Sequence, residues 1–295
     1  MTGLVRSISG SNLFRLRHLG LQEQVSLVEC DLTDLSQVIK LISSVQPDEI
    51  YNLAAQSSVS LSFQQPIGTI TFNINSVVNI LEAIRLVNAK IRFYQASSSE
   101  MFGKIEALPI NEESKIHPLS PYAISKAAAH YITVNYRESY SLFTSCGILF
   151  NHESYLRSEN FFVKKLIRGA LDITQGRRED LEFGNLEIKR DFGWAEKYVE
   201  AMWLMLQYEQ PDDFVICSGV SLRLRDLVEY VFAKLDIPLA KIKINATFFR
   251  PTEIIDIKGS SQKAQSLLQW EYNLSFYQVL DKLIAEEQQN YDVRP

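Results

Sequence analysis

Residues 91–103 read IRFYQASSSEMFG, a short apolar run that ends in a cluster of serines and one glutamate. A run of this length, bounded by small polar residues, is typical of a buried strand. Similar runs lie at residues 3–5, 25–30, 49–53, 144–149 and 213–217. Segments with helical periodicity separate them, at residues 35–44, 69–87, 121–140, 161–175, 194–207 and 224–234. Strands that alternate with helices in this way predict an α/β fold with a doubly wound parallel sheet.

The composition is that of a globular protein, with 46% hydrophobic residues, 22% charged residues and a net charge of −5. This mild acidity argues against nucleic acid as a partner, because phosphate binding needs clustered positive charge. We find no apolar run that approaches a membrane span and no signal-peptide pattern in the first residues. The three cysteines and four histidines are scattered and form no CxxC pair, so no metal site is expected. We expect a cytoplasmic protein without a membrane partner.

The pattern of elements changes near residue 150. Residues 1–150 carry most of the alternating strands and are expected to form a Rossmann-like nucleotide-binding domain. Residues 151–295 are mainly helical with polar interruptions, which favours a smaller substrate-binding lobe. Segments such as 213–217 are expected to return to the main sheet.

Two neighbouring elements carry residues suited to catalysis. Tyr122 and Lys126 stand four residues apart on a predicted helix and therefore project from one face. A lysine ammonium there predicts that the tyrosine pKa falls from about 10 towards neutrality, so that the tyrosine can exchange a proton with a sugar hydroxyl. Ser98 and Glu100 follow the strand at 91–95, where they can bind the reacting hydroxyl and act as an acid or base. A tyrosine and a lysine at this spacing are common on helix surfaces, and serines are common in turns. Together they predict a Ser–Tyr–Lys catalytic group.

Several longer segments resemble one known family. They read QASSSE at 95–100, SPYAISK at 120–126, GILFNHES at 147–154, KRD at 189–191 and FRPTE at 249–253. The chain resembles the extended short-chain dehydrogenase/reductases of the NAD-dependent epimerase/dehydratase superfamily, and within them the GDP-mannose 4,6-dehydratase family, from about residue 3 to residue 288. Ser98 stands at the position of that family's catalytic threonine.

The resemblance implies a set of site residues. The catalytic residues would be Ser98, Glu100, Tyr122 and Lys126. The cofactor would be NADP, bound by Arg6, Asp31, Leu32, Leu53, Ala54, Ala55, Gln56, Tyr122 and Lys126. The substrate would be GDP-mannose or a related GDP-sugar, bound by Asn151, Glu153, Ser154, Asn185, Lys189, Arg190, Arg250 and Glu253. Arginine suits this role because its planar fork engages phosphate oxygens in pairs.

The resemblance also implies the reaction, a lyase reaction in which NADP-mediated internal redox and loss of water give GDP-4-keto-6-deoxymannose. Family members usually pair through helices that correspond to 69–87 and 121–140, which implies a homodimer or homotetramer. The related GDP-4-keto-6-deoxymannose reductase shares the same catalytic residue types and is the alternative enzyme. The pathway that the reaction serves is left open.

One feature of the family is missing from the sequence. The family begins with a strand and a glycine-rich GxxGxxG turn that cradles the cofactor pyrophosphate, and no such motif occurs here. About 25 residues, the usual length of such a unit, would be absent. A displaced start codon, an incomplete sequence or a truncated protein with weak or absent NADP binding would each explain this. The third explanation leaves open a non-catalytic protein that binds nucleotide sugars. Smaller departures from the family pattern are Leu156, Phe192 and Lys197.

Overall fold

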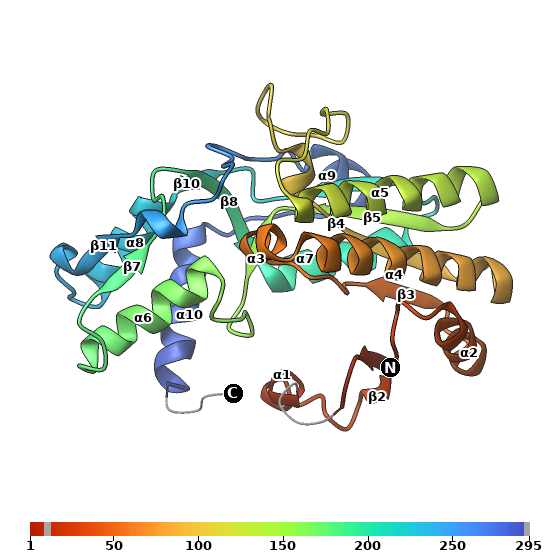
Figure 1. The fold of residues 1–295 in the computed structure, drawn as a ribbon, viewed down its shortest axis with the longest axis horizontal. Coiled ribbons are helices and arrows are strands. Elements are labelled where there is room, and N and C mark those ends of the chain that lie inside the picture. The colour runs from red at the N-terminus through yellow and green to blue at the C-terminus, as the bar shows by residue number, and fades with distance from the viewer. Residues whose placement is uncertain (9–12, 292–295) are drawn as a thin grey trace.

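The centre of the protein is a four-stranded parallel sheet. The computed structural model describes residues 1–8 and 13–291, and Figure 1 shows their arrangement. The strand order is β3-β4-β5-β9, and all three pairings are parallel. These strands are β3 (Glu49–Asn52), β4 (Arg92–Ser98), β5 (Thr144–Leu149) and β9 (Asp213–Ile216). The last strand therefore returns to the sheet from the second half of the chain.

Helices cover both faces of this sheet. On one face, α2 (Leu35–Val45), α4 (Pro66–Val87) and α5 (Pro121–Tyr140) form a core with buried residues such as Leu81 and Phe93. On the other face, α7 (Ala195–Gln207) and α9 (Gln262–Leu268) enclose Tyr94 and Trp270. Burial on both faces explains why the strands read as continuous apolar runs.

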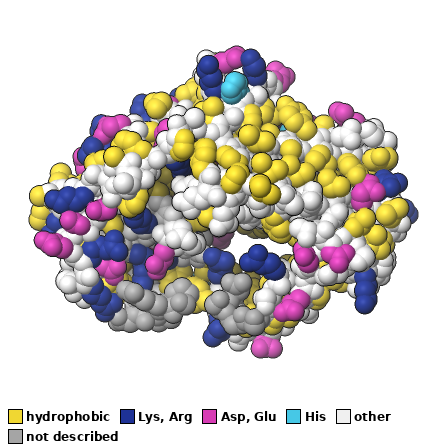
Figure 2. Space-filling view, viewed as in Figure 1, with side chains coloured by type: hydrophobic (Ala, Val, Ile, Leu, Met, Phe, Trp, Pro, Cys, Tyr) yellow, Lys and Arg dark blue, Asp and Glu magenta, His cyan; other side chains and the backbone are white. Residues whose placement is uncertain are grey.

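The first two strands form a separate sheet. β1 (Thr2–Val5) and β2 (Ser26–Glu29) pair in parallel with each other, and no ladder within the described residues joins β1 to β3. Between them in the chain, α1 (Phe14–His18) reaches the second lobe, where the Arg15 Nε donates to the Leu156 carbonyl at 3.0 Å. Figure 2 shows an opening between this N-terminal unit and the rest of the molecule. The parallel strands are thus divided between β1 and β3, where the family's first strand, which this sequence lacks, was expected.

The second lobe is built on short strands. β6 (Asn151–Glu153), β8 (Lys189–Trp194) and β10 (Ser221–Arg223) form a sheet of order β10-β8-β6, while β7 (Leu181–Phe183) pairs with β11 (Ile242–Ile244). Three helices pack around them: α6 (Phe162–Thr174), α8 (Leu224–Lys234) and α10 (Phe276–Gln289). Phe192 is buried in this core and stacks on Phe276, with ring centroids 4.8 Å apart.

The long elements agree closely with the predicted ranges. β5, α5 and α8 begin and end at the predicted residues, whereas β4 continues three residues beyond its predicted end, to Ser98. No helix was predicted at α9 or at the 14-residue α10. The periodicity of the sequence also did not indicate β6, β7, β8, β10 and β11, or the short helices α1 and α3 (Val59–Gln64). Elements of three to six residues contain too few positions to show a period.

Helix α4 meets the length and mean hydropathy of a membrane span, whereas the apolar runs of the sequence predicted no such segment. Buried core helices meet the same criteria, and α4 carries buried Asn73 and Ser76 where it packs in the core with α2 and α5. The absence of a membrane partner stays a prediction.

Candidate active site

The ends of β4 and α5 bring Ser98 and Tyr122 together. Ser98 ends β4, and its Oγ accepts a hydrogen bond from the Glu100 amide at 3.3 Å, which caps the short helix η2 (Ser99–Phe102). Ser120 caps α5 by accepting from the Ala123 amide at 3.1 Å, so Tyr122 lies in the first turn. Ser98 lies near enough to the Tyr122 hydroxyl to lower its pKa, and both residues are buried. The predicted juxtaposition of these two residues is present.

Lys126 lies one turn further along α5. Its side chain is buried, and its Nζ donates to the Ala96 carbonyl at 2.8 Å. Burial lowers the pKa of Lys126 to about 8. The turn after Tyr122 therefore carries an ammonium that loses its proton more readily than an ordinary lysine does.

The predicted fall in the pKa of Tyr122 is wrong for this structure. Burial, together with the charge of Glu100, raises the pKa of Tyr122 to about 12, while the nearby Ser98 hydroxyl and the charge of Arg157 act in the opposite direction. Desolvation of the phenolate outweighs these two contributions. The Lys126 ammonium points to the Ala96 carbonyl rather than to the phenol.

Glu100 lies beside a cluster of predicted substrate residues. The buried Arg190 guanidinium donates to the Ile254 carbonyl at 2.7 Å and to Glu253 Oε1 at 2.9 Å. Arg250 Nη1 lies 3.5 Å from the same Glu253 oxygen. Burial lowers the pKa of Arg190, and the charges of Glu100 and Glu253 partly offset this effect. Arg190 is committed to the protein, so the half-buried Arg250 is the more accessible guanidinium of the pair.

Glu153 is a buried carboxylate at the end of β6. Its side chain is 4% exposed, and burial raises its pKa to about 7. Its Oε2 has no hydrogen-bond partner in residues 1–8 and 13–291 and lies 3.6 Å from the Arg157 Nε. The Arg157 guanidinium stacks over the Phe161 ring at 3.7 Å. Sequence reasoning missed Arg157 as a site residue, although its position four residues after Glu153 was a usable signal.

The loop after β3 is held beside α5 by hydrogen bonds. The buried Asn52 donates to Gln95 Oε1 at 2.9 Å, and the Ala54 amide donates back to Asn52 at 3.2 Å. The Gln56 amide donates to Asn73 Oδ1 at 2.8 Å, and Asn73 in turn donates to Ser125 on α5 at 2.9 Å. Ala55 is half-buried in this loop, while Leu53 is 56% exposed. The predicted cofactor loop therefore adjoins α5, the helix that carries Tyr122 and Lys126.

The other predicted cofactor residues lie on the separate sheet. Arg6 follows β1 and is exposed. Asp31 follows β2 and accepts hydrogen bonds from Thr33, which lower its pKa together with the charge of Arg6. Leu32 is buried, and its carbonyl accepts from Asn79 at 2.9 Å. Because β1 and β2 are not paired with the main sheet, these residues are not tied to Tyr122 by a common sheet.

The remaining predicted substrate residues fall into two groups. Asn151 and Ser154 are half-buried on either side of Glu153. Asn185 and Lys189 have local partners instead, because Asn185 accepts from the Glu187 amide at 2.9 Å and the Lys189 Nζ lies 3.6 Å from Asp256. The fold gathers the first group around the buried carboxylate.

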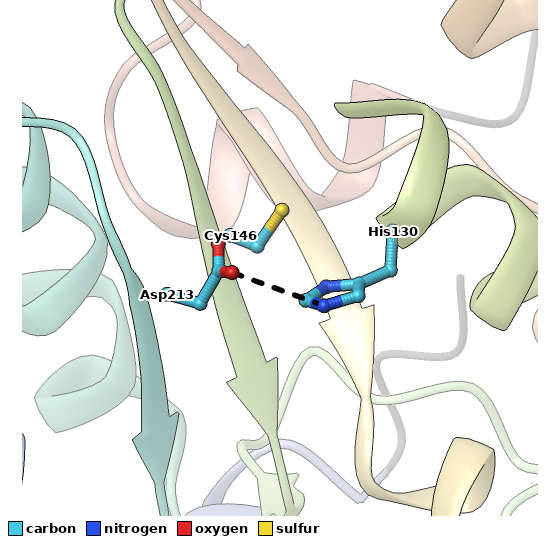
Figure 3. Close-up of side chains that lie close together, drawn as sticks. All are labelled: His130, Cys146 and Asp213. Atoms are coloured by element: carbon cyan, nitrogen blue, oxygen red, sulfur yellow. Dashed lines mark ion pairs between the residues drawn. The ribbon is translucent and has the colours of Figure 1, made fainter. Parts of the chain in front are cut away.

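The fold also gathers a group that the sequence did not indicate. His130, Cys146 and Asp213 come from three elements, and their potential ligand atoms lie within 4.8 Å of one another (Figure 3). Both carboxylate oxygens of Asp213 accept from the Arg137 guanidinium, at 3.1 and 2.8 Å. Burial raises the pKa of the Cys146 thiol. A carboxylate already paired with a guanidinium suits a cation poorly, so this group is better described as a buried polar network.

Comparison with known proteins decides the family. The model of the family described as GDP-mannose 4,6 dehydratase matches residues 1–283. The chain belongs to the GDP-mannose 4,6-dehydratase family. It is 40% identical over 296 residues to GDP-mannose 4,6 dehydratase 1 of Arabidopsis thaliana, which covers 97% of this chain and 82% of the relative. The GDP-mannose 4,6 dehydratase of Dictyostelium discoideum is also 40% identical, with 90% of this chain and 80% of the relative covered.

Solved structures of similar fold confirm the Rossmann-like architecture of this member of the GDP-mannose 4,6-dehydratase family. RMD from Pseudomonas aeruginosa, complexed with NADPH, superimposes with a TM-score of 0.83 at 23% identity, over 98% of this chain and 99% of that one. DesIV, a dTDP-glucose 4,6-dehydratase from Streptomyces venezuelae with NAD and TYD bound, gives 0.88 at 18% identity, over 98% and 87%. At this level of identity they establish the fold alone.

Proposed function

We propose that this protein is a GDP-mannose 4,6-dehydratase, a hydro-lyase that uses NADP and releases water from the sugar. The observation that carries the proposal is the proximity of Ser98 and Tyr122 at the end of β4, with Lys126 one turn further along α5 and Glu100 two residues after Ser98. Curated GDP-mannose 4,6-dehydratases at 35% to 40% identity over most of the chain support the substrate.

The residues at the carboxyl ends of the main strands fit the nicotinamide end of a dinucleotide. The loop at 53–56 is held against α4 and adjoins Tyr122 and Lys126 through Asn73 and Ser125. An exposed apolar Leu53 there offers a surface for a flat ring. Arg6 supplies an exposed cation for the 2′-phosphate that distinguishes NADP from NAD. When bound, the cofactor would supply the acceptor and donor of the hydride.

Tyr122 would take the proton of the sugar 4-hydroxyl, while Ser98 orients that hydroxyl. A phenol with a pKa of about 12 needs nearby positive charge to act as a base at neutral pH. Arg157 is placed for this, because its charge already lowers the pKa of Tyr122. Lys126 lies one turn away with its Nζ on the Ala96 carbonyl, and it would have to turn towards the phenol to add to this effect.

Glu100 would carry the dehydration step. Oxidation at C4 acidifies the C5 proton, which Glu100 would remove and pass to the 6-hydroxyl, so that the C6–O bond breaks and water leaves. The buried Arg190 guanidinium lies close enough to Glu100 for their charges to interact. The carboxylate therefore has the charge partner that a proton shuttle needs.

The second lobe would hold the nucleotide. The half-exposed Arg250 is suited to the diphosphate, because a guanidinium fork binds phosphate oxygens in pairs. Glu253 would accept from a ribose hydroxyl, while Asn151 and Ser154 would contact the sugar near Glu153. Lys189 and Asn185 would lie further out along the same lobe.

We also propose a cytoplasmic homodimer or homotetramer. The described cysteines are free and buried, which agrees with a reducing compartment. Exposed apolar side chains on α4 and α5 supply the contact surface: Ile67, Leu86, Ile124, Tyr131 and Tyr140. Figure 2 shows hydrophobic side chains gathered over this region. Light scattering of the purified protein measures the assembly, and a monomer at micromolar concentration would contradict this proposal.

The test is product analysis of the purified chain with GDP-mannose and NADP⁺. A dehydratase yields the 4-keto-6-deoxy sugar without net formation or consumption of NADPH. A need for stoichiometric NADPH and a keto-sugar substrate would identify the alternative reductase. GDP-sugar binding in calorimetry, without NADP binding or turnover, would identify a non-catalytic binder.

Two tyrosine variants control this experiment. Tyr122→Phe removes the catalytic hydroxyl and should lower turnover by a factor of about 10² to 10⁴. Tyr230→Phe removes a phenol that donates to Asp281 at 2.8 Å on the second lobe, away from the site, and should leave turnover unchanged. Equal effects of the two substitutions would overturn the catalytic role of Tyr122.

A further inference from the structure

One face of α5 carries polar side chains at four-residue intervals that contact the end of β4. Tyr122 lies near Ser98, and the Lys126 Nζ donates to the Ala96 carbonyl. His130, the next residue in this series, has its Nδ1 3.1 Å from the Ser97 Oγ. Three successive turns of α5 thus contact three successive residues of β4, the strand that ends at Ser98.

The imidazole of His130 is held from both sides. Its side chain is 8% exposed, and its Nε2 lies 3.9 Å from Asp213 Oδ2 on β9 (Figure 3). Asp213 is itself fixed by two hydrogen bonds from Arg137, which also donates to the Thr144 carbonyl at 3.0 Å. The carboxylate favours the tautomer with a proton on Nε2. Nδ1 is then the acceptor for the Ser97 hydroxyl.

The surroundings keep this imidazole neutral. Burial lowers the pKa of His130, with Arg137 acting in the same direction and Asp213 in the opposite one. Cys146 on β5 adds no charge, because burial holds its pKa well above the usual value. The charged groups that face the ring from α5 and β9 are therefore one guanidinium and one carboxylate, already paired with each other. A neutral ring leaves Nδ1 free to accept from Ser97 at neutral pH.

We propose that His130 is a positioning residue for the catalytic pair. By binding Ser97 it sets the end of β4 against α5, and so fixes the distance between the adjacent Ser98 and the Tyr122 hydroxyl. This inference rests on the proposed function, in which Ser98 and Tyr122 together hold the reacting hydroxyl. His130 does not touch the substrate and would act through Ser97 and Ser98.

The test compares two replacements of His130 with similar loss of volume. His130→Asn places an amide oxygen near the position of Nδ1 and keeps an acceptor for Ser97, whereas His130→Leu removes it. We expect His130→Leu to lower kcat by a factor of about 10 to 100 with KM for GDP-mannose changed less than threefold, and His130→Asn to recover most of the loss. Equal kcat values in the leucine variant and the unchanged protein, or an asparagine variant as slow as the leucine variant, would overturn the proposal.

A second readout does not depend on activity. The ¹³C resonance of the Tyr122 ring carbon that bears the hydroxyl, assigned by its loss in Tyr122→Phe, reports how that hydroxyl lies relative to Ser98. We expect it to move in His130→Leu and in Ser97→Ala, and to stay near its original value in His130→Asn. If the unchanged chain shows no dehydratase activity but these shifts occur, the proposed function fails and the positioning role stands. If the leucine variant does not fold, Ser97→Ala supplies both readouts, and an unmoved resonance with unchanged kcat would refute the positioning role.

Discussion

Replacing Glu153 by glutamine should stabilise the protein, and by more at pH 8 than at pH 5. The carboxyl is buried, and its pKa rises from 4.5 to about 7 because burial disfavours the charged form. Between these two values the folded state binds more protons than the unfolded state does, so folding stability falls as the pH rises. Glutamine has nearly the same shape and does not ionise, so the variant is free of this cost.

The size of the effect follows from the pKa change. One pKa unit corresponds to about 1.4 kcal/mol, so ionisation of Glu153 costs about 3 kcal/mol at pH 8 and under about 1 kcal/mol at pH 5. The entropy of unfolding is about 2.1 cal/mol/K per residue, or about 0.6 kcal/mol/K for this chain. The melting temperature of Glu153→Gln should therefore exceed that of the unchanged protein by about 5 °C at pH 8 and by about 1 °C at pH 5.

The assay is calorimetry or circular dichroism at both pH values, with Glu209→Gln as the control. Glu209 is exposed and lies two residues after the end of α7. Its replacement should therefore leave the melting temperature unchanged at pH 5 and at pH 8. In parallel, KM for GDP-mannose should rise in Glu153→Gln if this carboxylate contacts the sugar. An equal gain in stability at both pH values, or a lower melting temperature at pH 8, would refute the reasoning that Glu153 is ionised at a cost.

Three further outcomes are expected. The proton leaves Lys126 as the pH rises through about 8, so kcat/KM should fall on the alkaline side near this value; a flat profile to pH 10 would contradict a catalytic ammonium. Gly147→Ala should destabilise by about 1 to 3 kcal/mol in denaturant titrations, because an added Cβ would lie 2.8 Å from the buried Tyr94 ring, whereas Gly68→Ala meets no neighbouring atom and serves as the control. Backbone amides of β1 should exchange hydrogen faster than those of β5, since an isolated two-stranded sheet is marginally stable; equal protection would show that β1 is held by more than its pairing with β2.

Much of the catalytic centre was predictable from local sequence. Ser98 follows a readable strand, and the spacing of Tyr122 and Lys126 places them on one face of a readable helix, so their proximity follows from the topology of parallel sheets. The same holds for the family, because its motifs are contiguous segments whose residue types are visible without a structure. By contrast, strands of three residues such as β6 and β7 were missed, since their existence depends on partners elsewhere in the chain.

The sequence by itself determined the fold class, the family and most of the long elements, because periodicity and motif spacing are local properties. Only the tertiary structure decided the protonation of those residues and the partners that they have. Burial reversed the predicted shift in the pKa of Tyr122, and Arg190 proved to be committed to Glu253 and the Ile254 carbonyl. His130 and Asp213 are brought to one network by three packed elements. Desolvation and Coulomb interactions depend on distances through space, and residues far apart in the chain set those distances.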